Sequence, residues 1–397
     1  MLKRFRINNF RSLLNVEFRP VGVNVLIGPN NAGKTNLCSA LRFLGLTASQ
    51  SLEDAIRASV GETWNIRNVY APRGPVEIEI ECSLPYGGVP TDFDYSLSFS
   101  VHTEPTASGQ TLYVSKEILK ATGGDFTQTE LVRNVEGRVS LLDEVWTRKN
   151  GGKYLHSEEF SVPPEATMLH RLYDHEATRC ASFFKRYIQS WAYYNLSPSA
   201  LRSPDVAQEA AGLRSDGANM TRTFFLLHNE QPYVEGKLIE MIRALEPRLN
   251  LFTYSSPDPE HVHLYMEDRE RNRFSTQSIS DGTLRFMAMT YLLLSGEDSK
   301  TDSSPRLTII EEPENGLYVG HLKPLFERLR TRGHPHQFIF TTHSPYFIDL
   351  FDSCLEGVHV VKPGAPSSEI KKLDIEKTKK LLAEMPLGEM HFREMLG

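Results

Sequence analysis

The chain has 397 residues, of which 40% are hydrophobic and 24% charged, and its formal net charge is −6 at pH 7. This length allows a large buried core, and the slight acidic excess argues against a generally basic nucleic-acid coat protein. The four cysteines are too far apart for a zinc site or a redox pair, which favours reduced thiols. No apolar stretch approaches the roughly 20 residues that a bilayer requires, and the N-terminus lacks the apolar region of a signal peptide. We therefore expect a cytoplasmic protein with no membrane partner.

The first part of the chain, residues 1–165, shows strand patterns around one helix. Residues 2–27 predict two or three strands, and the last is the apolar run "VNVLI". A helix should begin near residue 35, because apolar residues then recur at helical spacing. "VEIEIEC" and "DYSLSFSV" alternate with period two, as half-buried antiparallel strands do. Residues 105–165 predict short strands between polar turns.

The rest of the chain changes character twice. Residues 166–245 carry long helical patterns with few β-branched runs, which predicts a helical insertion. Strand patterns return in residues 246–397, where "LTII" and "FIFTT" are short apolar runs typical of buried strands. The sequence therefore predicts an α/β fold in two parts, residues 1–165 and 246–397, around a helical insertion.

The segment "GPNNAGKT" directly follows "VNVLI" and matches the phosphate-loop pattern G-x-x-x-x-G-K-[ST]. In this pattern, backbone N–H groups of the loop and of the next helix converge on phosphate oxygens. Lys34 would add a positive charge at those phosphates, and the Thr35 hydroxyl would ligate Mg²⁺. The alternative is a Gly/Asn turn that merely precedes a helix. The predicted nucleotide-binding residues are Gly28, Pro29, Asn30, Asn31, Ala32, Gly33, Lys34, Thr35 and Asn36.

Two adjacent carboxylates, Glu311 and Glu312, end the strand-like run "LTII". In a phosphate-loop site, the first acid holds Mg²⁺ through water and the second positions the attacking water. The alternative is a strand that ends in a solvated acidic turn.

Two further segments have both a functional and a structural interpretation. "SISDGTLRFMAMTYLL" predicts a helix whose N-terminus could bind an anion, or in which Ser280 or Asp281 simply caps a core helix. "FIFTTHSP" predicts a buried strand that ends at His343. That histidine could also be a core residue with a backbone partner.

The order of these motifs is phosphate loop, Ser-Asp-Gly helix, double-acid strand and histidine strand, which is the order found in ABC-type ATPase heads. The chain resembles the RecF/SMC/OLD branch of these ATPases, often labelled AAA-type. The resemblance implies an ABC-type P-loop ATPase head with a mixed sheet, an antiparallel N-terminal subdomain and a helical insertion. It covers both ends of the chain well and the middle poorly. The segments that carry it are "INNFRSLLNVEF", "VLIGPNNAGKTNL", "LRSDGANM", "ISDGTLRFMAM", "IIEEPENGL" and "FTTHSPYFID".

The resemblance also implies roles for individual residues. Residues 28–35 would be Walker A, and Asn315–Leu317 would lie in the D-loop. The signature, which contacts the γ-phosphate held by the opposing subunit in such heads, would be Ser280, Asp281 and Gly282. The implied catalytic residues are Glu312, His343 and Lys34, and the implied Mg²⁺ ligands are Thr35 and Glu311.

The chain departs from the common ABC pattern at three points. Transporter-type heads usually carry Asp at the magnesium acid, where this chain has Glu311, although OLD-like relatives often share the Glu-Glu form. The signature reads Ser-Asp-Gly-Thr instead of Ser-Gly-Gly-Gln. No glutamine lies between Gln50 and Gln110, so no Q-loop is assigned.

The implied function is an ATP-binding and ATP-hydrolysing head that uses Mg²⁺ and forms a homodimer or a higher homo-oligomer. Its role would be to regulate a partner in a bacterial DNA-maintenance or anti-phage defence system. One alternative is a RecF-like repair ATPase that clamps DNA. A weaker alternative is the ATP-binding subunit of an ABC transporter.

The partners are also inferred from the resemblance. OLD-like relatives that cut DNA carry a Toprim nuclease after the ATPase, whereas about fifty residues follow His343 here and contain no Asp-x-Asp. We therefore expect a separate effector protein, a nuclease or a toxin. DNA is a further candidate partner, and its contacts would come from Lys3, Arg4 and Arg6 or from Lys185 and Arg186, although both clusters could be ordinary solvated surface.

Overall fold

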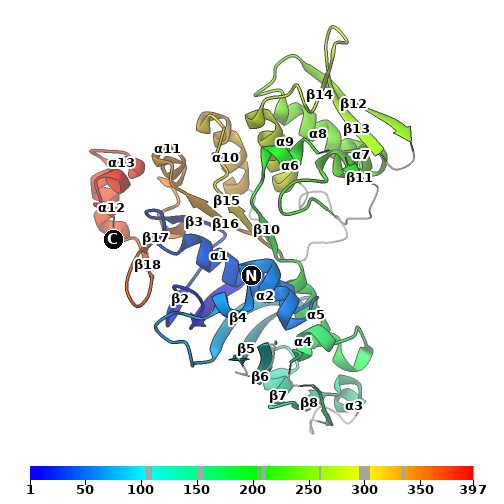
Figure 1. Ribbon diagram of the computed structural model, residues 1–397, viewed down its shortest axis with the longest axis vertical. Helices are drawn as coiled ribbons and strands as arrows, with labels where there is room; N and C mark the ends of the chain where they lie inside the picture. Colours follow the sequence, from blue (N-terminus) through cyan, green and yellow to red (C-terminus); the bar gives the residue numbers. More distant parts are fainter. Residues whose placement is uncertain are drawn as a thin grey trace.

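Three sheets with helices around them make up the computed structural model (Figure 1). Within the described part of the chain, no helix is both long and apolar enough to cross a bilayer. The structure describes residues 1–103, 110–149, 156–163, 165–203, 205–206, 212–258, 261–294, 305–331 and 336–396.

The central sheet has the strand order β10-β15-β16-β3-β17-β18, and its neighbours are parallel except for β17 and β18. β3, β15 and β16 contain the apolar runs that predicted buried strands. Parallel strands end at the same edge of a sheet, so the segments that follow these three strands meet there. The strands are β3 (Val23–Ile27), β10 (Ala192–Tyr194), β15 (Leu307–Glu311), β16 (Gln337–Thr342), β17 (Val358–Lys362) and β18 (Glu369–Lys372).

An eight-stranded antiparallel sheet forms the N-terminal subdomain, in the order β2-β1-β4-β5-β6-β7-β8-β9. Alternate residues of β4 are buried, which is the pattern that predicted this strand. The strands are β1 (Leu2–Asn8), β2 (Val16–Phe18), β4 (Val76–Tyr86), β5 (Val89–Thr103), β6 (Gln110–Gly123), β7 (Phe126–Val135), β8 (Arg138–Leu142) and β9 (Ser157–Ser161).

A small third sheet lies with α6 to α9 in a lobe of its own (Figure 1). It contains β11 (Asp205–Val206), β12 (Leu249–Asp258), β13 (His261–Asp268) and β14 (Arg273–Ser275).

The α-helices are α1 (Lys34–Thr47), α2 (Leu52–Val60), α3 (Glu144–Lys149), α4 (Met168–Arg171), α5 (Arg179–Gln189), α6 (Pro198–Leu201), α7 (Met220–Glu230), α8 (Pro232–Ile242), α9 (Asp281–Leu294), α10 (Lys323–Thr331), α11 (Pro345–Ile348), α12 (Ile375–Leu382) and α13 (Leu387–Phe392). The 3-10 turns are η1 (Thr63–Ile66), η2 (Glu176–Thr178), η3 (Val319–His321), η4 (Asp349–Phe351) and η5 (Leu355–Gly357).

The parallel sheet separates two hydrophobic cores. Leu26, Ile309 and Ile339 belong to the core shared with α1 and the antiparallel sheet. Val25 and Ile27 belong to the core shared with α7, α8 and α9. Neighbouring residues of β3 therefore serve opposite cores, as expected for a strand that is covered on both faces.

The middle of the chain, residues 105–245, differs from the sequence-based expectations in two ways. Residues 166–245 contain α4 to α8, but they also supply β10 to the parallel sheet, and the proposed boundaries of this region stay a prediction. The expectation of short strands in 105–165 was wrong for β6 and β7, which have 14 and 10 residues. Register shifts between these strands break the period-two pattern that would reveal a long strand. Residues 104–109, 150–155 and 164 lie outside the described residues.

Candidate nucleotide-binding site

The predicted phosphate loop connects the end of β3 to α1. Gly28 and Gly33 have φ values of 151° and 109°, which side chains rarely allow. A Cβ atom at Gly28 would lie 2.1 Å from the carbonyl oxygen of Val361, so the loop packs closely against the end of β17. Pro29, Asn30 and Thr35 are exposed, and Lys34 is buried. The loop thus has the conformation that its glycine pattern predicted, with its first residues open to a ligand.

The Lys34 side chain is bonded to the backbone of its own loop. Its Nζ donates to the carbonyl oxygens of Gly28, at 2.7 Å, and of Pro29, at 3.0 Å. Burial lowers the pKa of Lys34 to about 8, although nearby carboxylates of Glu312 and Glu311 oppose this effect. Phosphate oxygens would be stronger acceptors than these two carbonyls, because a charged acceptor makes a shorter and stronger bond.

His343 and Glu312 lie beside Lys34, as the strand order requires. His343 follows β16 and Glu312 follows β15, and both strands end at the same edge as β3. Lys34 Nζ is 3.4 Å from His343 Nδ1, and His343 Nε2 is 3.6 Å from Glu312 Oε1. Burial and the charge of Lys34 lower the pKa of His343, which favours the neutral ring. A neutral His343 can accept from Lys34 at Nδ1 and keep its proton at Nε2, toward Glu312.

The backbone of Glu312 has an uncommon conformation. Its φ is 43°, in the left-handed region that non-glycine residues seldom adopt. The Glu312 N–H donates to the carbonyl oxygen of Thr341 at 3.0 Å, and the Asn315 side chain donates to Glu312 Oε2. Strained backbone often occurs at functional sites, where the surroundings hold a side chain in one direction. Here these contacts fix the direction in which the Glu312 carboxylate points.

Glu311 has the features of a cation ligand. Its Oε1 is buried and has no hydrogen-bond partner. Burial raises the pKa of Glu311, and the hydroxyl groups of Tyr193 and Thr35 and the thiol of Cys38 oppose this by hydrogen bonding. A hard cation such as Mg²⁺ prefers oxygen ligands of this kind, so Glu311 and Thr35 fit the predicted metal site. The described residues contain no cluster of three or more His, Cys, Asp or Glu side chains that could hold a metal ion.

Two residues at this site were missed from the sequence. Glu314 is buried, accepts from the Thr342 hydroxyl and from the His343 N–H, and leaves its Oε2 buried without a partner. Burial lowers the pKa of Arg285, one turn into α9, and the nearby charges of Asp281, Glu312 and Glu314 oppose this effect. The third acid in "EEPENGL" was a signal for Glu314. Arg285 had no sequence signal, because only the packing of α9 brings it to this edge of the sheet.

The last predicted residue of the loop, Asn36, joins the first motif to the N-terminal strands. Its Nδ2 donates to Ser12 Oγ at 2.8 Å, and Arg11 Nη1 donates to Asn36 Oδ1 at 3.3 Å. Asn31, with φ of 60°, and the buried Ala32 complete the turn. The N-terminal segment "FRS" therefore lies against the start of α1.

The predicted signature residues lie in the other lobe, at the start of α9 (Figure 1). Ser280 Oγ accepts from the Thr283 N–H at 3.1 Å, so Ser280 does cap the helix. The Asp281 carboxylate is 2.8 Å from Arg202 Nη2, which also donates to the carbonyl oxygen of Ile279 at 2.5 Å. No hydrogen bond or ion pair between described residues joins Ser280–Gly282 to the phosphate loop of the same chain.

Gly282 contacts the segment that follows Glu312 in the same chain. A Cβ atom at Gly282 would lie 2.4 Å from the carbonyl oxygen of Gly316, within the predicted D-loop. The absence of a side chain at Gly282 thus allows the start of α9 to approach the turn "PENG". The helix start is positioned by Arg202 on one side and by Gly316 on the other.

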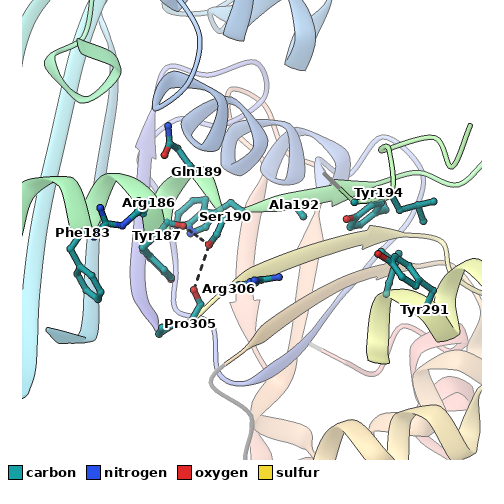
Figure 2. A pocket seen from close by; sticks show the side chains of 14 residues that line it. Phe183, Arg186, Tyr187, Gln189, Ser190, Ala192, Tyr194, Tyr291, Pro305 and Arg306 are labelled. Atoms are coloured by element: carbon teal, nitrogen blue, oxygen red, sulfur yellow. Dashed lines mark hydrogen bonds between the residues drawn. The ribbon is translucent and has the colours of Figure 1, made fainter. Parts of the chain in front are cut away.

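A cavity of about 810 Å³ lies at the opposite edge of the parallel sheet, where β10 and β15 begin (Figure 2). Tyr187, Tyr194 and Tyr291 line it, from α5, β10 and α9. Ser190 Oγ donates to the carbonyl oxygen of Pro305 at 3.5 Å across one side. This cavity contains none of the predicted site residues, and phosphate loops bind at the other edge of such sheets.

The comparisons with known proteins agree with this geometry. Residues 1–134 match a family model described as an AAA ATPase domain. Residues 168–349 match a model described as "AAA domain, putative AbiEii toxin, Type IV TA system". Both matches support the SMC/RecF/OLD-like group of ABC-type ATPases that the sequence motifs predicted. The first model covers the phosphate loop. The second covers the signature, the double-acid strand end and the histidine motif.

The fold of this ATPase head is similar to that of solved SMC heads. An SMC head bound to the C-terminal winged-helix domain of ScpA has a TM-score of 0.54 and 11% identity, over 95% of this chain and 99% of that chain. Two others have lower TM-scores and support no argument. These are the head from Thermotoga maritima (0.43, 12% identity, 94% and 99% coverage) and that from Pyrococcus furiosus with an extended coiled coil (0.47, 11%, 96% and 98%). The first match confirms the predicted ABC-type fold, and no curated protein matched the sequence.

Proposed function

We propose that this ATPase head binds ATP with Mg²⁺, hydrolyses it and closes as a dimer around the nucleotide. The observation that supports the proposal most strongly is the meeting of Lys34, His343 and Glu312 at the ends of three adjacent strands. A cation, a neutral imidazole and a carboxylate in this order suit a terminal phosphate and a water beside it.

In the proposed reaction, the loop N–H groups and Lys34 hold the β- and γ-phosphates. Glu312 orients the water that attacks the γ-phosphate, and His343 lies between Lys34 and Glu312, where it can donate from Nε2. Thr35 and Glu311 would hold Mg²⁺, which supplies charge neutralisation at the phosphates. Most of the rate enhancement would come from positioning and electrostatics, as in other phosphoryl transfers.

We propose dimerisation because no hydrogen bond or ion pair between described residues joins the signature residues to the phosphate loop of the same chain. The start of α9 offers free polar groups next to the exposed Ser280 and Asp281. A second copy could present this helix start to the γ-phosphate, so each ATP would contact two subunits. Symmetric pairing with two equivalent sites is the usual arrangement for a homodimer.

We further propose that the nucleotide state controls a separate effector in a bacterial defence or DNA-maintenance system. The support is the description of the family model over residues 168–349, which names a putative toxin of a type IV toxin–antitoxin system. The alternative of direct DNA clamping has less support, because three of the basic residues expected to contact DNA have internal partners. Arg4 pairs with Glu81, Arg186 pairs with Asp174, and Lys185 donates to two carbonyl oxygens.

The test is ATP binding and phosphate release by the purified chain and by Lys34→Ala. The variant should bind ATP about a hundredfold more weakly, because it loses a charge-assisted hydrogen bond to phosphate. Lys377→Ala, which removes an exposed lysine of α12, is the matched control and should bind like the unmodified chain. Failure of the unmodified chain to bind MgATP, or normal binding by Lys34→Ala, would overturn the proposal.

A further inference from the structure

The C-terminal helix α13 packs against the segment that follows His343. The Gly388 N–H donates to Asp349 Oδ1 at 2.7 Å. A Cβ atom at Gly388 would lie 2.1 Å from the carbonyl oxygen of Pro345, so α13 touches the backbone of α11 directly. The two short helices therefore form one packed unit beside the phosphate loop (Figure 1).

A cavity of about 560 Å³ lies between this unit and the phosphate loop. Its walls include Gly28 and Pro29 from the loop, His343, and His391 with two of its neighbours on and after α13, Phe392 and Glu394. The residues that begin the phosphate loop therefore share a cavity with the C-terminal residues. A ligand that extends beyond the loop on the His343 side would enter this cavity.

Two histidine side chains, His343 and His391, line the cavity next to the start of the phosphate loop. His391 is half-buried, and burial together with the charges of Lys34 and His343 lowers its pKa. Lys34 and His343 are therefore near enough to His391 to act on it electrostatically. Glu394 also lines the cavity, and the Glu312 carboxylate is 3.6 Å from His343 Nε2. An ammonium group and two imidazole rings near one another can donate to an anion at this end of the cavity.

We propose that His391 is a ligand of the terminal phosphate of bound ATP, so that the C-terminal helix distinguishes ATP from ADP. The inference rests on the proposed ATP binding and adds a contact that the motif pattern does not contain. His391 would approach the phosphate from α13, whereas Lys34 and His343 approach it from α1 and the end of β16. Because α13 is packed on α11, the contact would link the phosphate to the C-terminal segment of the chain.

The experiment measures the dissociation constants of both MgATP and MgADP for His391→Ala. Loss of one hydrogen bond to a charged phosphate should weaken ATP binding about tenfold. ADP binding should change less than about twofold, because ADP lacks the phosphate that His391 would contact. His391→Gln keeps a donor and should restore part of the ATP affinity. Arg393→Ala is the matched control, because Arg393 is two positions away, pairs with Glu389 and does not line the cavity, so the change should alter neither constant.

The ratio of the two constants separates this role from a structural one. If His391→Ala weakens ATP and ADP equally, or weakens neither, the proposal is overturned while ATP binding by the chain stands. If His391→Ala also lowers the melting temperature, His391→Gln distinguishes the two roles. Recovery of ATP affinity relative to ADP affinity in His391→Gln supports a phosphate contact, because a purely packing role would affect both nucleotides alike. Absence of ATP binding in the unmodified chain would overturn both proposals.

Discussion

The phosphate-loop cluster and the start of α9 carry the two halves of one expected ATP site, but they differ in how their charges are arranged. At the phosphate loop, one buried oxygen of Glu311 and one of Glu314 have no partner among the described residues, and Lys34 donates to two carbonyl groups of its own loop and lies beside His343. At the start of α9, Asp281 already has Arg202 as its partner, and Ser280 caps the helix.

The difference indicates a division of roles between the two regions. We expect the first region to bind MgATP by itself, because it combines buried carboxylate oxygens with a buried lysine in the phosphate loop. The second region has its charges balanced within the chain and offers only a polar helix start. We therefore expect variants of the first region to change nucleotide binding or chemistry, and variants of the second to change turnover alone.

The largest effect is expected from Glu312→Gln. The amide cannot accept a proton from the attacking water, so kcat should fall on the order of a thousandfold. The dissociation constant for ATP should stay within about twofold, because Lys34 and the loop remain. Single-turnover phosphate release together with equilibrium ATP binding would measure both. Normal turnover in this variant would remove Glu312 from the catalytic role and transfer it to Glu311 or Glu314.

A smaller effect, on the metal, is expected from Glu311→Gln. Loss of one carboxylate should raise the Mg²⁺ concentration for half-maximal ATPase activity about tenfold or more. ATP binding in the presence of EDTA should not change. Glu314→Gln is the matched comparison, because Glu314 is already bonded to Thr342 and to the backbone of His343. If Glu314→Gln raises the Mg²⁺ requirement and Glu311→Gln does not, the assignment of Glu311 as a Mg²⁺ ligand is wrong.

The smallest effect is expected from Arg202→Gln. It removes the ion pair with Asp281 and weakens the bond to the Ile279 carbonyl, so the start of α9 should lose its fixed direction. We expect turnover to fall about fivefold while ATP affinity stays the same, because the phosphate loop lies in the other lobe. Arg273→Gln breaks an ion pair with Glu267 elsewhere in that lobe and is the control. A parallel loss of ATP affinity in Arg202→Gln would contradict the separation of the two regions.

The sequence predicted the residues that lie in continuous motifs. The phosphate loop, the acids after β15 and the histidine after β16 each follow a short apolar strand, and strand ends on one sheet edge meet by topology. The α/β fold was predictable for the same reason. β10 was not, because a run of three residues between helical segments carries no clear period.

Other residues were beyond the reach of the sequence, because tertiary packing alone brings them to the site. Arg202 pairs with Asp281, which is 79 positions later in the chain. Arg285 of α9 lies near Glu312 and Glu314, which follow β15. His391 lies in a segment with no motif and meets the phosphate loop only through the packing of α13 on α11. Long-range contacts of this kind leave no spacing pattern in a single sequence.

The measurement that tests the central claim most directly is complementation between two inactive variants. Lys34→Ala disables the phosphate loop, and Ser280→Asp places a negative charge where the γ-phosphate of the partner subunit would lie. An aspartate at 280 can still cap α9, as serine does, so the helix start should stay folded. Ser280→Asn, which caps without adding charge, is the control and should stay active. Gly282 is unsuitable for this test, because any side chain there would meet the Gly316 carbonyl of its own chain.

In a mixed dimer, one site would carry both lesions and the other would be intact. Each variant alone should be inactive, and an equal mixture should recover roughly a quarter of the ATPase activity, since half of the dimers are mixed and each has one working site. If the mixture stays inactive while mixed dimers form by size-exclusion chromatography and cross-linking, the phosphate loop and Ser280 do not act in the same site across two subunits.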